Sequence, residues 1–420
     1  MMQTFLVGGA VRDELLGLPV KERDWVIVGE TPEALVSKGF KPVGREFPVY
    51  LHPETHEEYA LARTERKIAP GYRGFRIQSS PEVTLEQDLL RRDLTINAIA
   101  RDAEGRIIDP CNGRRDIELR LLRHVSDAFR EDPVRILRVA RFAARYAHLG
   151  FEVARETGVL MKSMVEAGEV DTLVPERVWS EFARALAERT PVAFITALRA
   201  CGAFGSLFPE LERLFGHSLP HDSYIETDAG ENALLALQNA ARIDESPVVR
   251  FAALVHGLGD GEGHDLGSGP DRDSKMAGLM ALKRLSEGLK VPAQYHALAS
   301  KVLRYQESCN NLFHLSAEQI VGLLHRLNAL RREADLKPFL TVCKALSLGP
   351  KDPVRRGFPQ GEFLLECQAA ALTVDARSIL QQGFKGAALG EELARVRVAA
   401  LQNQLIRRSH HDADGTKAKV

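Results

Sequence analysis

Three acidic residues near the start of the chain have the types and spacing to bind a divalent cation. Glu22 and Asp24 flank Arg23 at the start of the segment RDWVIV, whose β-branched and aromatic residues predict a strand. Side chains two residues apart in a strand share a face, so the two carboxylates can converge while Arg23 points away. Glu58, in a second predicted strand, is the best candidate for a third carboxylate, because Glu57 faces the opposite way. Mg²⁺ takes oxygen ligands and leaves positions open for substrate phosphates, so this set fits nucleotidyl transfer; the alternative is a charged edge strand facing solvent.

A diglycine that precedes these carboxylates could bind phosphate. Gly8 and Gly9 separate an apolar segment, predicted as a strand, from a short predicted helix that carries Arg12 on its first turn. Glycine lets the backbone approach a ligand closely, and the free N–H groups of a helix start favour phosphate. Arg12 can add charge-assisted hydrogen bonds to the same group. The alternative for the diglycine alone is a tight turn without a ligand.

The segment RRDLTINA holds a third group of polar residues. In a helix, Arg92, Asp93 and Asn97 fall within one turn of each other. They would then offer a cation for phosphate, and carboxylate and amide groups for a ribose. A solvated, charged helix face is the alternative.

The segment EDPVRILRVARF combines a marked helix start with a row of cations. Asp132 is a good N-cap and Pro133 suits the first helical position, so a helix is predicted to begin here. Arginines recur every three or four residues along it: Arg135, Arg138, Arg141 and Arg145. With few acids between them, these cations should repel each other unless an anion or an RNA backbone lies against them. The row therefore predicts a phosphate-binding or RNA-binding surface.

The elements that must position these residues change in type along the chain. Mixed α/β structure is predicted for the first 110 residues, with strands at 3–7, 23–28, 49–51 and 57–62. After Val83 the apolar residues take up the 3.6-residue period of helices, and from Asp116 to Leu405 nearly every segment is predicted to be helical. Residues 408–420 are polar without periodicity and are predicted to fray.

Composition limits the possible classes of protein. At 420 residues the chain is too long for one compact core, and its 45% hydrophobic and 27% charged residues are ordinary for a globular protein. No 18-residue apolar run or secretory signal is present, which predicts a cytoplasmic protein with no membrane partner. The five cysteines are never spaced as CxxC, so buried single thiols are expected. The net charge of −1 hides a local excess of arginine, with nine arginines and five acids within residues 114–145.

In order and spacing, these motifs resemble those of a known family. GGAVRDELLG, ERDW, EYALARTERK, RRDLTINA and EDPVRILRVARF are similar to the motif series of the bacterial class II tRNA nucleotidyltransferases, the CCA-adding enzymes. The resemblance runs from residue 5 to about 145 and continues more weakly through Thr172 to Glu181 and Gly383 to Leu393. It is specific to the superfamily that also contains the bacterial poly(A) polymerases.

The resemblance implies a role for each motif. It implies a nucleotide phosphate site at Gly9 and Arg12, and Mg²⁺ on Glu22 and Asp24, the first of which is Asp in many relatives. It also implies contacts to triphosphate or ribose from Arg92, Asp93 and Asn97. Asp132 and Arg135 would form a protein template that reads the bases of CTP and ATP, and Arg138 and Arg141 would complete the nucleotide pocket.

The expected fold class is α+β, with a nucleotidyltransferase head like the polymerase-β palm followed by an all-α neck, body and tail. The expected domains are the head over residues 1–140, a helical neck and body over 141–222, a degenerate HD-like domain over 223–330 and a helical tail over 331–420. The expected activity is transfer of CMP, CMP and AMP from CTP and ATP to the tRNA 3′ hydroxyl, with release of pyrophosphate. The expected partners are tRNA and the two nucleotides, with the chain a monomer or a homodimer.

A poly(A) polymerase of the same superfamily is the nearest alternative. Those enzymes tend to carry a basic pair after the glycine of the second hairpin and a basic C-terminal extension. This chain has Gly44-Arg45-Glu46-Phe47-Pro48 at that point, and its tail is short. CCA addition is therefore expected.

A metal-dependent phosphohydrolase is an alternative of a different class, because many relatives carry an HD domain behind the head. Such a site needs several His and Asp ligands. The segment FAALVHGLG keeps His256 but has Gly257 in place of the Asp, and the two other histidine positions correspond to Asn232 and Ser268. The pair His264-Asp265 lies in a Gly/Asp-rich loop that would not fix it. No phosphohydrolase activity is expected, and His256 is predicted to be a packed core histidine. A noncatalytic RNA-binding protein is disfavoured because both metal carboxylates are present.

Overall fold

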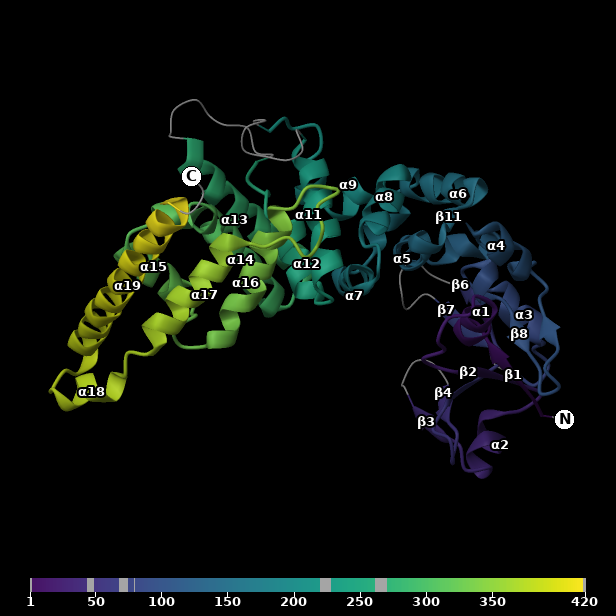
Figure 1. Ribbon diagram of the computed structural model, residues 1–420. Helices are drawn as coiled ribbons and strands as arrows, with labels where there is room; N and C mark the ends of the chain where they lie inside the picture. Colours follow the sequence, from purple (N-terminus) through teal and green to yellow (C-terminus); the bar gives the residue numbers. More distant parts are fainter. Residues whose placement is uncertain are drawn as a thin grey trace. The chain divides into compact units, whose positions relative to one another are not determined.

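The structure, a computed structural model, divides the chain into two compact units, Met1–Pro209 (unit 1) and Glu210–Val420 (unit 2). It describes residues 2–43, 49–67, 75–78, 80–219, 228–260 and 270–417, without the side chains of 65–67, 75–78, 270–273 and 403–417. Sheet and helices together form unit 1, whereas the described part of unit 2 is helical (Figure 1). The predicted α+β class is thus confirmed; the finer division into four domains stays a prediction.

A seven-stranded mixed sheet forms the base of unit 1, with the strand order β3-β4-β5-β2-β1-β8-β9. The strands are β1 (Gln3–Val7), β2 (Asp24–Val28), β3 (Lys41–Val43), β4 (Val49–Leu51), β5 (Glu58–Leu61), β8 (Ala100–Arg101) and β9 (Ile107–Ile108). All four predicted strands are present. β2 and β5 are parallel neighbours, whereas the other neighbours are antiparallel. Glu22 lies just before β2 rather than within it, so only Asp24 of the acidic pair belongs to the strand.

Four short helices lie between the strands along the chain. They are α1 (Gly9–Leu15), α2 (Pro32–Ser37), α3 (Leu85–Leu90) and α4 (Gly113–Leu119). A hairpin of β6 (Thr64–Lys67) and β7 (Phe75–Gln78) forms a separate two-stranded sheet. Thr84 begins α3 with a capping box, since its hydroxyl accepts a hydrogen bond from the Gln87 backbone N–H and the Gln87 side chain accepts one from the Thr84 N–H.

The prediction of one helix for Arg92, Asp93 and Asn97 is wrong. α3 ends at Leu90, Leu94 is extended and forms an isolated β-bridge with His124, and Thr95–Asn97 is a separate 3₁₀ turn. Pairing of Leu94 with a distant part of the chain overrides the local helical pattern.

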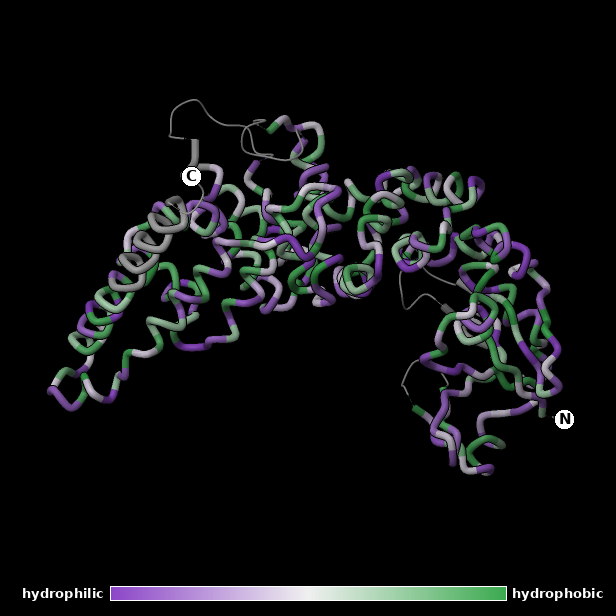
Figure 2. The backbone as a smooth tube through the Cα atoms, viewed as in Figure 1, coloured by the Kyte–Doolittle hydropathy of each residue, from purple (hydrophilic) through white to green (hydrophobic). Residues whose placement is uncertain are grey.

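The remaining helices of unit 1 follow α4 in the chain and include α5, the arginine-rich helix. They are α5 (Val134–Tyr146), α6 (Arg155–Glu166), α7 (Pro175–Ala187), α8 (Val192–Ala200) and α9 (Ala203–Leu207), with a short parallel pair, β10 (Leu121–Leu122) and β11 (Glu152–Val153). The apolar side of α5 is fully enclosed, with Ile136, Leu137, Val139 and Ala140 at 0% exposure. Hydrophilic and hydrophobic residues alternate along these helices of unit 1 (Figure 2), as expected for helices with one buried face.

After α10 (Pro209–Glu212), the described helices of unit 2 are α11 (Ala229–Ile243), α12 (Pro247–Leu254), α13 (Pro270–Leu289), α14 (Ala293–Asn310), α15 (Ala317–Arg326), α16 (Leu336–Leu346), α17 (Pro359–Leu372), α18 (Ala376–Gln381) and α19 (Gly386–Lys417). α19 extends to Lys417 and so continues past residue 408, where fraying is predicted. All five cysteines are free, and four of them are buried as predicted. Among the described residues, none of the helices combines the length and the apolar character that a membrane span requires.

Candidate active site

All twelve predicted site residues line one hollow of unit 1, which has a volume of about 840 Å³. Its wall is highly charged, with ten arginines and six carboxylates. The arginines are Arg12, Arg63, Arg91, Arg92, Arg135, Arg138, Arg141, Arg145, Arg177 and Arg184. The carboxylates are Glu22, Asp24, Glu58, Asp93, Asp132 and Glu181. A hollow with this excess of positive charge can hold a polyanion such as a nucleoside triphosphate.

The three carboxylates of the predicted metal site all line this wall. Asp24 and Glu58 are paired in register on the parallel strands β2 and β5, so their side chains share a face, and Glu22 lines the hollow beside them. The pKa of Asp24 lies above its ordinary value, mainly because burial removes water from the carboxylate. The nearby Arg92 acts to lower this pKa, and the neighbouring carboxylate of Glu22 acts to raise it. Glu57 points to the opposite face, where it accepts a hydrogen bond from Trp25 Nε1 (2.9 Å). Among the described residues, no three acidic, histidine or cysteine side chains are grouped closely enough to hold a metal ion by themselves. Carboxylate oxygens are the donors that Mg²⁺ prefers, and one or two of them would bind it together with substrate phosphates.

The diglycine brings the backbone close to the cations of the hollow. Gly8 has φ of +66°, and a Cβ there would lie 2.6 Å from Arg92 Nη1, so a side chain at this position would be both strained and obstructed. Arg12 is buried, with its guanidinium over the rings of Phe142 and Tyr146 at 5.3 and 5.2 Å. It also donates hydrogen bonds to Asp13 (2.9 Å) and to Asn97.

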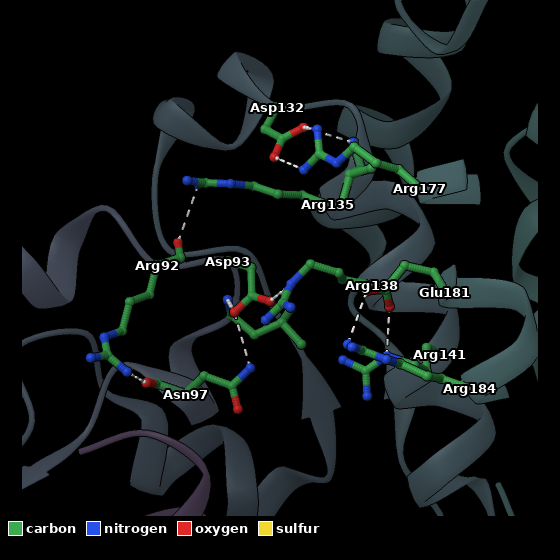
Figure 3. Close-up of polar contacts among 12 residues, drawn as sticks. Arg92, Asp93, Asn97, Asp132, Arg135, Arg138, Arg141, Arg177, Glu181 and Arg184 are labelled. Carbon is green, nitrogen blue, oxygen red and sulfur yellow. Dashed lines mark hydrogen bonds and ion pairs between the residues drawn. The ribbon is translucent and has the colours of Figure 1, made fainter. Parts of the chain in front are cut away.

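Arg92, Asp93 and Asn97 meet through tertiary contacts although they share no helix. Asn97 Nδ2 donates to Asp93 Oδ1 (3.0 Å), and Arg92 Nη1 donates to the Asn97 carbonyl (3.2 Å) (Figure 3). Burial would raise the pKa of Asp93, but Arg138, the Asn97 amide and the Leu94 N–H outweigh it and hold this pKa well below its ordinary value. Asp93 is therefore a fixed anion in the wall of the hollow.

Carboxylates from other elements pair with three of the four α5 arginines, which corrects the prediction that the row needs an external anion. Arg138 Nε donates to Asp93 (2.7 Å), Arg141 Nε to Glu181 (2.6 Å) and Arg145 Nη2 to Asp13 (2.9 Å). These pairs hold the guanidinium groups in place before any ligand arrives. Spacing along one helix could not reveal the pairs, because each acid is at least 40 residues away in sequence.

The two residues of the predicted template lie at the start of α5. Asp132 Oδ1 accepts a hydrogen bond from the Val134 N–H (3.1 Å), but α5 begins at Val134 with Pro133 in the N-cap position, one residue later than predicted. Figure 3 shows Arg177 of α7 facing Asp132, while Arg135 extends below them towards Arg92. The Arg135 side chain approaches the Arg92 carbonyl at 3.5 Å.

One face of α7 is a part of the wall that none of the strong motifs contains. Arg177, Ser180, Glu181 and Arg184 all line the hollow. Their spacing of three, one and three residues is that of one helical face, which is the signal that could have identified them. Only the weaker resemblance through Thr172 to Glu181 points to this helix.

Outside unit 1, the residues at the HD-like positions make ordinary core contacts. His256 is buried as predicted; its Nδ1 lies 2.8 Å from the Ala253 carbonyl and its Nε2 lies 3.1 Å from Asn232 Nδ2. Burial lowers the pKa of His256 to about 4, although the Ala253 carbonyl acts to raise it. Ser268 and the pair His264-Asp265 lie outside the described residues, as do residues 44–48 of the second hairpin.

Comparisons with known proteins agree with the motif series. Residues 4–123 match the family described as "Poly A polymerase head domain", and residues 150–215 match "Probable RNA and SrmB- binding site of polymerase A". The "Multifunctional CCA protein" of Methylococcus capsulatus is 55% identical over 97% of this chain and 96% of its own length. The protein of the same name from Thioalkalivibrio sulfidiphilus is 52% identical over 96% and 98%.

Solved structures share the fold at lower identity. A CCA-adding enzyme in complex with CTP has a TM-score of 0.62 at 21% identity, covering 98% of this chain and 91% of that one. The Thermotoga maritima CCA-adding enzyme complexed with tRNA has a TM-score of 0.61 at 19% identity, covering 94% and 86%. With relatives that match over nearly their whole length, the chain belongs to the family of the CCA proteins, the tRNA nucleotidyltransferases that its motifs resemble.

Proposed function

We propose that this protein builds and repairs the CCA 3′ terminus of tRNA by transferring CMP, CMP and AMP from CTP and ATP, and that the reaction takes place in the hollow of unit 1. The observation that carries the proposal is the meeting, in one hollow, of a carboxylate set, a row of fixed arginines and an Asp–Arg pair at a helix start. Full-length relatives of the same family support it.

In this mechanism Glu22 and Asp24 hold Mg²⁺, with Glu58 beside them on the neighbouring strand. Divalent cations held there would supply Lewis acidity to the tRNA 3′ oxygen and to the leaving pyrophosphate. The arginines along α5 bind the triphosphate, and because their acidic partners already orient them, little reorganisation accompanies binding. Gly9 lets the triphosphate approach the backbone.

Asp132 and Arg135 select the base. Cytosine and adenine both present an amino donor next to a ring-nitrogen acceptor, which an Asp acceptor and an Arg donor can match after a small rotation. Uracil and guanine present a carbonyl in place of that amino group and a ring N–H in place of the acceptor, so in the same pose both groups of the pair stay unpaired. An unpaired buried polar group costs about 1–3 kcal/mol, which is enough for selection without a nucleic-acid template.

The tRNA is held by shape and by backbone contacts, as duplex RNA usually is, and the match over residues 150–215 supports contacts in the helical part of unit 1. A tRNA substrate favours the cytoplasm as the compartment. A monomer or a homodimer is compatible with this chemistry.

The function can be tested with tRNA transcripts that end before the CCA terminus, after its first C and after its second C. Each is incubated with Mg²⁺ and one nucleotide at a time, and the length of the product is measured. We expect CTP to add two residues to the first transcript, ATP to add one residue only to the third, and UTP and GTP to add none. Asp24→Asn is the inactive control. Long tails from ATP alone would instead identify a poly(A) polymerase.

A further inference from the structure

Residues on the face of α7 that lines the hollow bond to α5 and to the residue Asp132 just before it. On the other side of α7, Val178, Phe182 and Ala185 are at most 2% exposed. From the lining face, Glu181 binds Arg141 at 2.6 Å, and one turn earlier Arg177 reaches Asp132. A helix fixed on one side and bonded on the other can set the orientation of the groups that it contacts.

Arg177 contacts Asp132 through both arms of its guanidinium. Nη1 donates to Oδ1 at 3.2 Å and Nη2 donates to Oδ2 at 2.8 Å, a side-on arrangement that fixes the plane of the carboxylate. The Val134 N–H also donates to Oδ1. A carboxylate accepts about four hydrogen bonds, so the contacts of the described residues leave one acceptor direction, on Oδ2. Both side chains are only partly exposed, at 27% for Arg177 and 21% for Asp132.

We propose that Arg177 is a positioning residue for base selection, which holds Asp132 so that its remaining acceptor direction meets the amino group of cytosine or adenine. This inference rests on the proposed function of the hollow. It assigns to Arg177 an influence on which nucleotide is incorporated, exerted through Asp132 and without contact to the reacting phosphate.

The physical reason lies in the freedom of an unheld aspartate. Rotation about the last side-chain bond of Asp is broad and has no sharp preferred angle. An Asp132 free to turn could accept from the ring N–H of uracil or of guanine as readily as from an amino group. The fork of Arg177 removes this freedom, whereas a lysine would supply charge from a single point and leave the carboxylate plane free.

The test measures kcat/KM for CTP, UTP, ATP and GTP on tRNA transcripts that accept C or A. In Arg177→Ala we expect the preference for CTP over UTP, and for ATP over GTP, to fall about tenfold or more, as for loss of one oriented hydrogen bond to a charged group. Arg177→Lys should lose part of the preference as well. In an Asp132→Asn background, Arg177→Ala should change the preference no further, because the two residues act as one unit.

Two matched variants separate this role from a structural one. Glu181→Gln, one turn along the same face, should raise KM for all four nucleotides alike and keep the preference. Arg106→Ala removes an exposed arginine that lies outside both the hollow and residues 150–215, and it should change neither value. If Arg177→Ala does not fold, which its thermal unfolding would reveal, Arg177→Lys carries the same measurements.

An unchanged preference in a folded Arg177 variant, or full preference in Arg177→Lys, would overturn the inference while leaving the proposed function intact. Failure of the wild-type protein to add C and A would overturn the proposed function itself.

Discussion

At the scale of single residues, several arginines of the hollow are held by acids of unit 1, which prepares the hollow for a highly charged ligand. Asp13 illustrates this, because it accepts hydrogen bonds from Arg12, Arg145 and the Tyr146 hydroxyl, each at 2.9 Å. Pairing of this kind offsets the repulsion among arginines and fixes their side chains. The nucleotide then meets a set of cations that needs little rearrangement.

The carboxylate on β5 gives a prediction with an internal control. Glu58 shares a face with Asp24, whereas Glu57 points to the other side of the sheet and bonds Trp25. Glu58→Gln should lower kcat for nucleotide addition by about 10²- to 10³-fold, because one carboxylate of the metal-binding set loses its charge. Glu57→Gln should keep near-normal kcat. Single-turnover addition of one C measures both, and equal effects in the two variants would contradict the assignment.

Buried His256 predicts a pH dependence of stability in unit 2. The pKa of His256 is about 4 in the folded state against 6.5 ordinarily. Between these two pH values the imidazole is protonated in the unfolded chain and neutral in the folded one. The contribution of His256 to stability is therefore complete above pH 6.5 and is lost as the pH falls towards 4, with a slope of up to about 1.4 kcal/mol per pH unit.

Denaturant unfolding followed between pH 7 and pH 4 measures this slope. His256→Gln should lose this part of it, and His314→Gln, at an exposed position, should keep it. Identical slopes for the wild-type protein and His256→Gln would show that His256 does not carry the effect.

The residue scale also shows what spacing can and cannot predict. Glu22, Asp24 and Glu58 could be grouped from their strand positions, because alternation of faces is a local property. The bond of Asp132 to Arg177 joins residues 45 positions apart, so no local pattern contains it. Arg138 and Asp93 are likewise separated by 45 positions, which is why the arginine row looked unpaired.

At the scale of elements, close packing between α4 and the Thr95–Asn97 turn sets the position of Asn97. A Cβ at Gly113, the first residue of α4, would lie 2.2 Å from the Thr95 carbonyl oxygen and 2.9 Å from an Ile99 side-chain atom. Only glycine allows this approach, and the contact joins α4 to the turn that carries one of the proposed nucleotide ligands.

Gly113→Ala should therefore destabilise unit 1 by about 1–3 kcal/mol, as overpacking of a close contact does, and weaken nucleotide binding. Gly158 on α6 is the matched control, because a Cβ there meets nothing within 4 Å. Gly158→Ala should be neutral or stabilising by up to about 1 kcal/mol. Thermal unfolding of both variants checks the pair, and equal stability of the two would contradict the packing argument.

Elements with strong local signals were predictable and those that depend on tertiary pairing were not. The apolar segment before Gly8 and the Thr84 capping box mark β1 and the start of α3 in the sequence itself. Residues 92–97 look helical, yet Leu94 pairs with His124 and breaks the helix. The strands β8 and β9 have two residues each, too few to show a period of their own.

At the scale of the whole molecule, the proposed chemistry belongs to unit 1, and unit 2 gives a prediction of an activity that it lacks. Glycine at 257 offers no ligand, and His256 is already bonded to Asn232 and Ala253. We therefore expect no Ni²⁺- or Mg²⁺-dependent hydrolysis of 2′,3′-cyclic nucleotides, 2′-nucleotides or phosphate esters. Hydrolysis stimulated by added metal, and lost in His256→Ala, would contradict this and direct attention to the His264-Asp265 pair.

The central claim is that side chains of the protein read the incoming base, and the most direct measurement is the sequence of the 3′ ends that the protein makes. A tRNA transcript lacking its terminus is incubated with all four nucleotides at equal concentration, and the products of wild type, Arg135→Ala and Arg141→Ala are sequenced. We predict CCA ends from the wild type, U and G among the added residues of Arg135→Ala, and slower but correct CCA ends from Arg141→Ala. Correct CCA ends from Arg135→Ala, or the same errors from both variants, would contradict the claim.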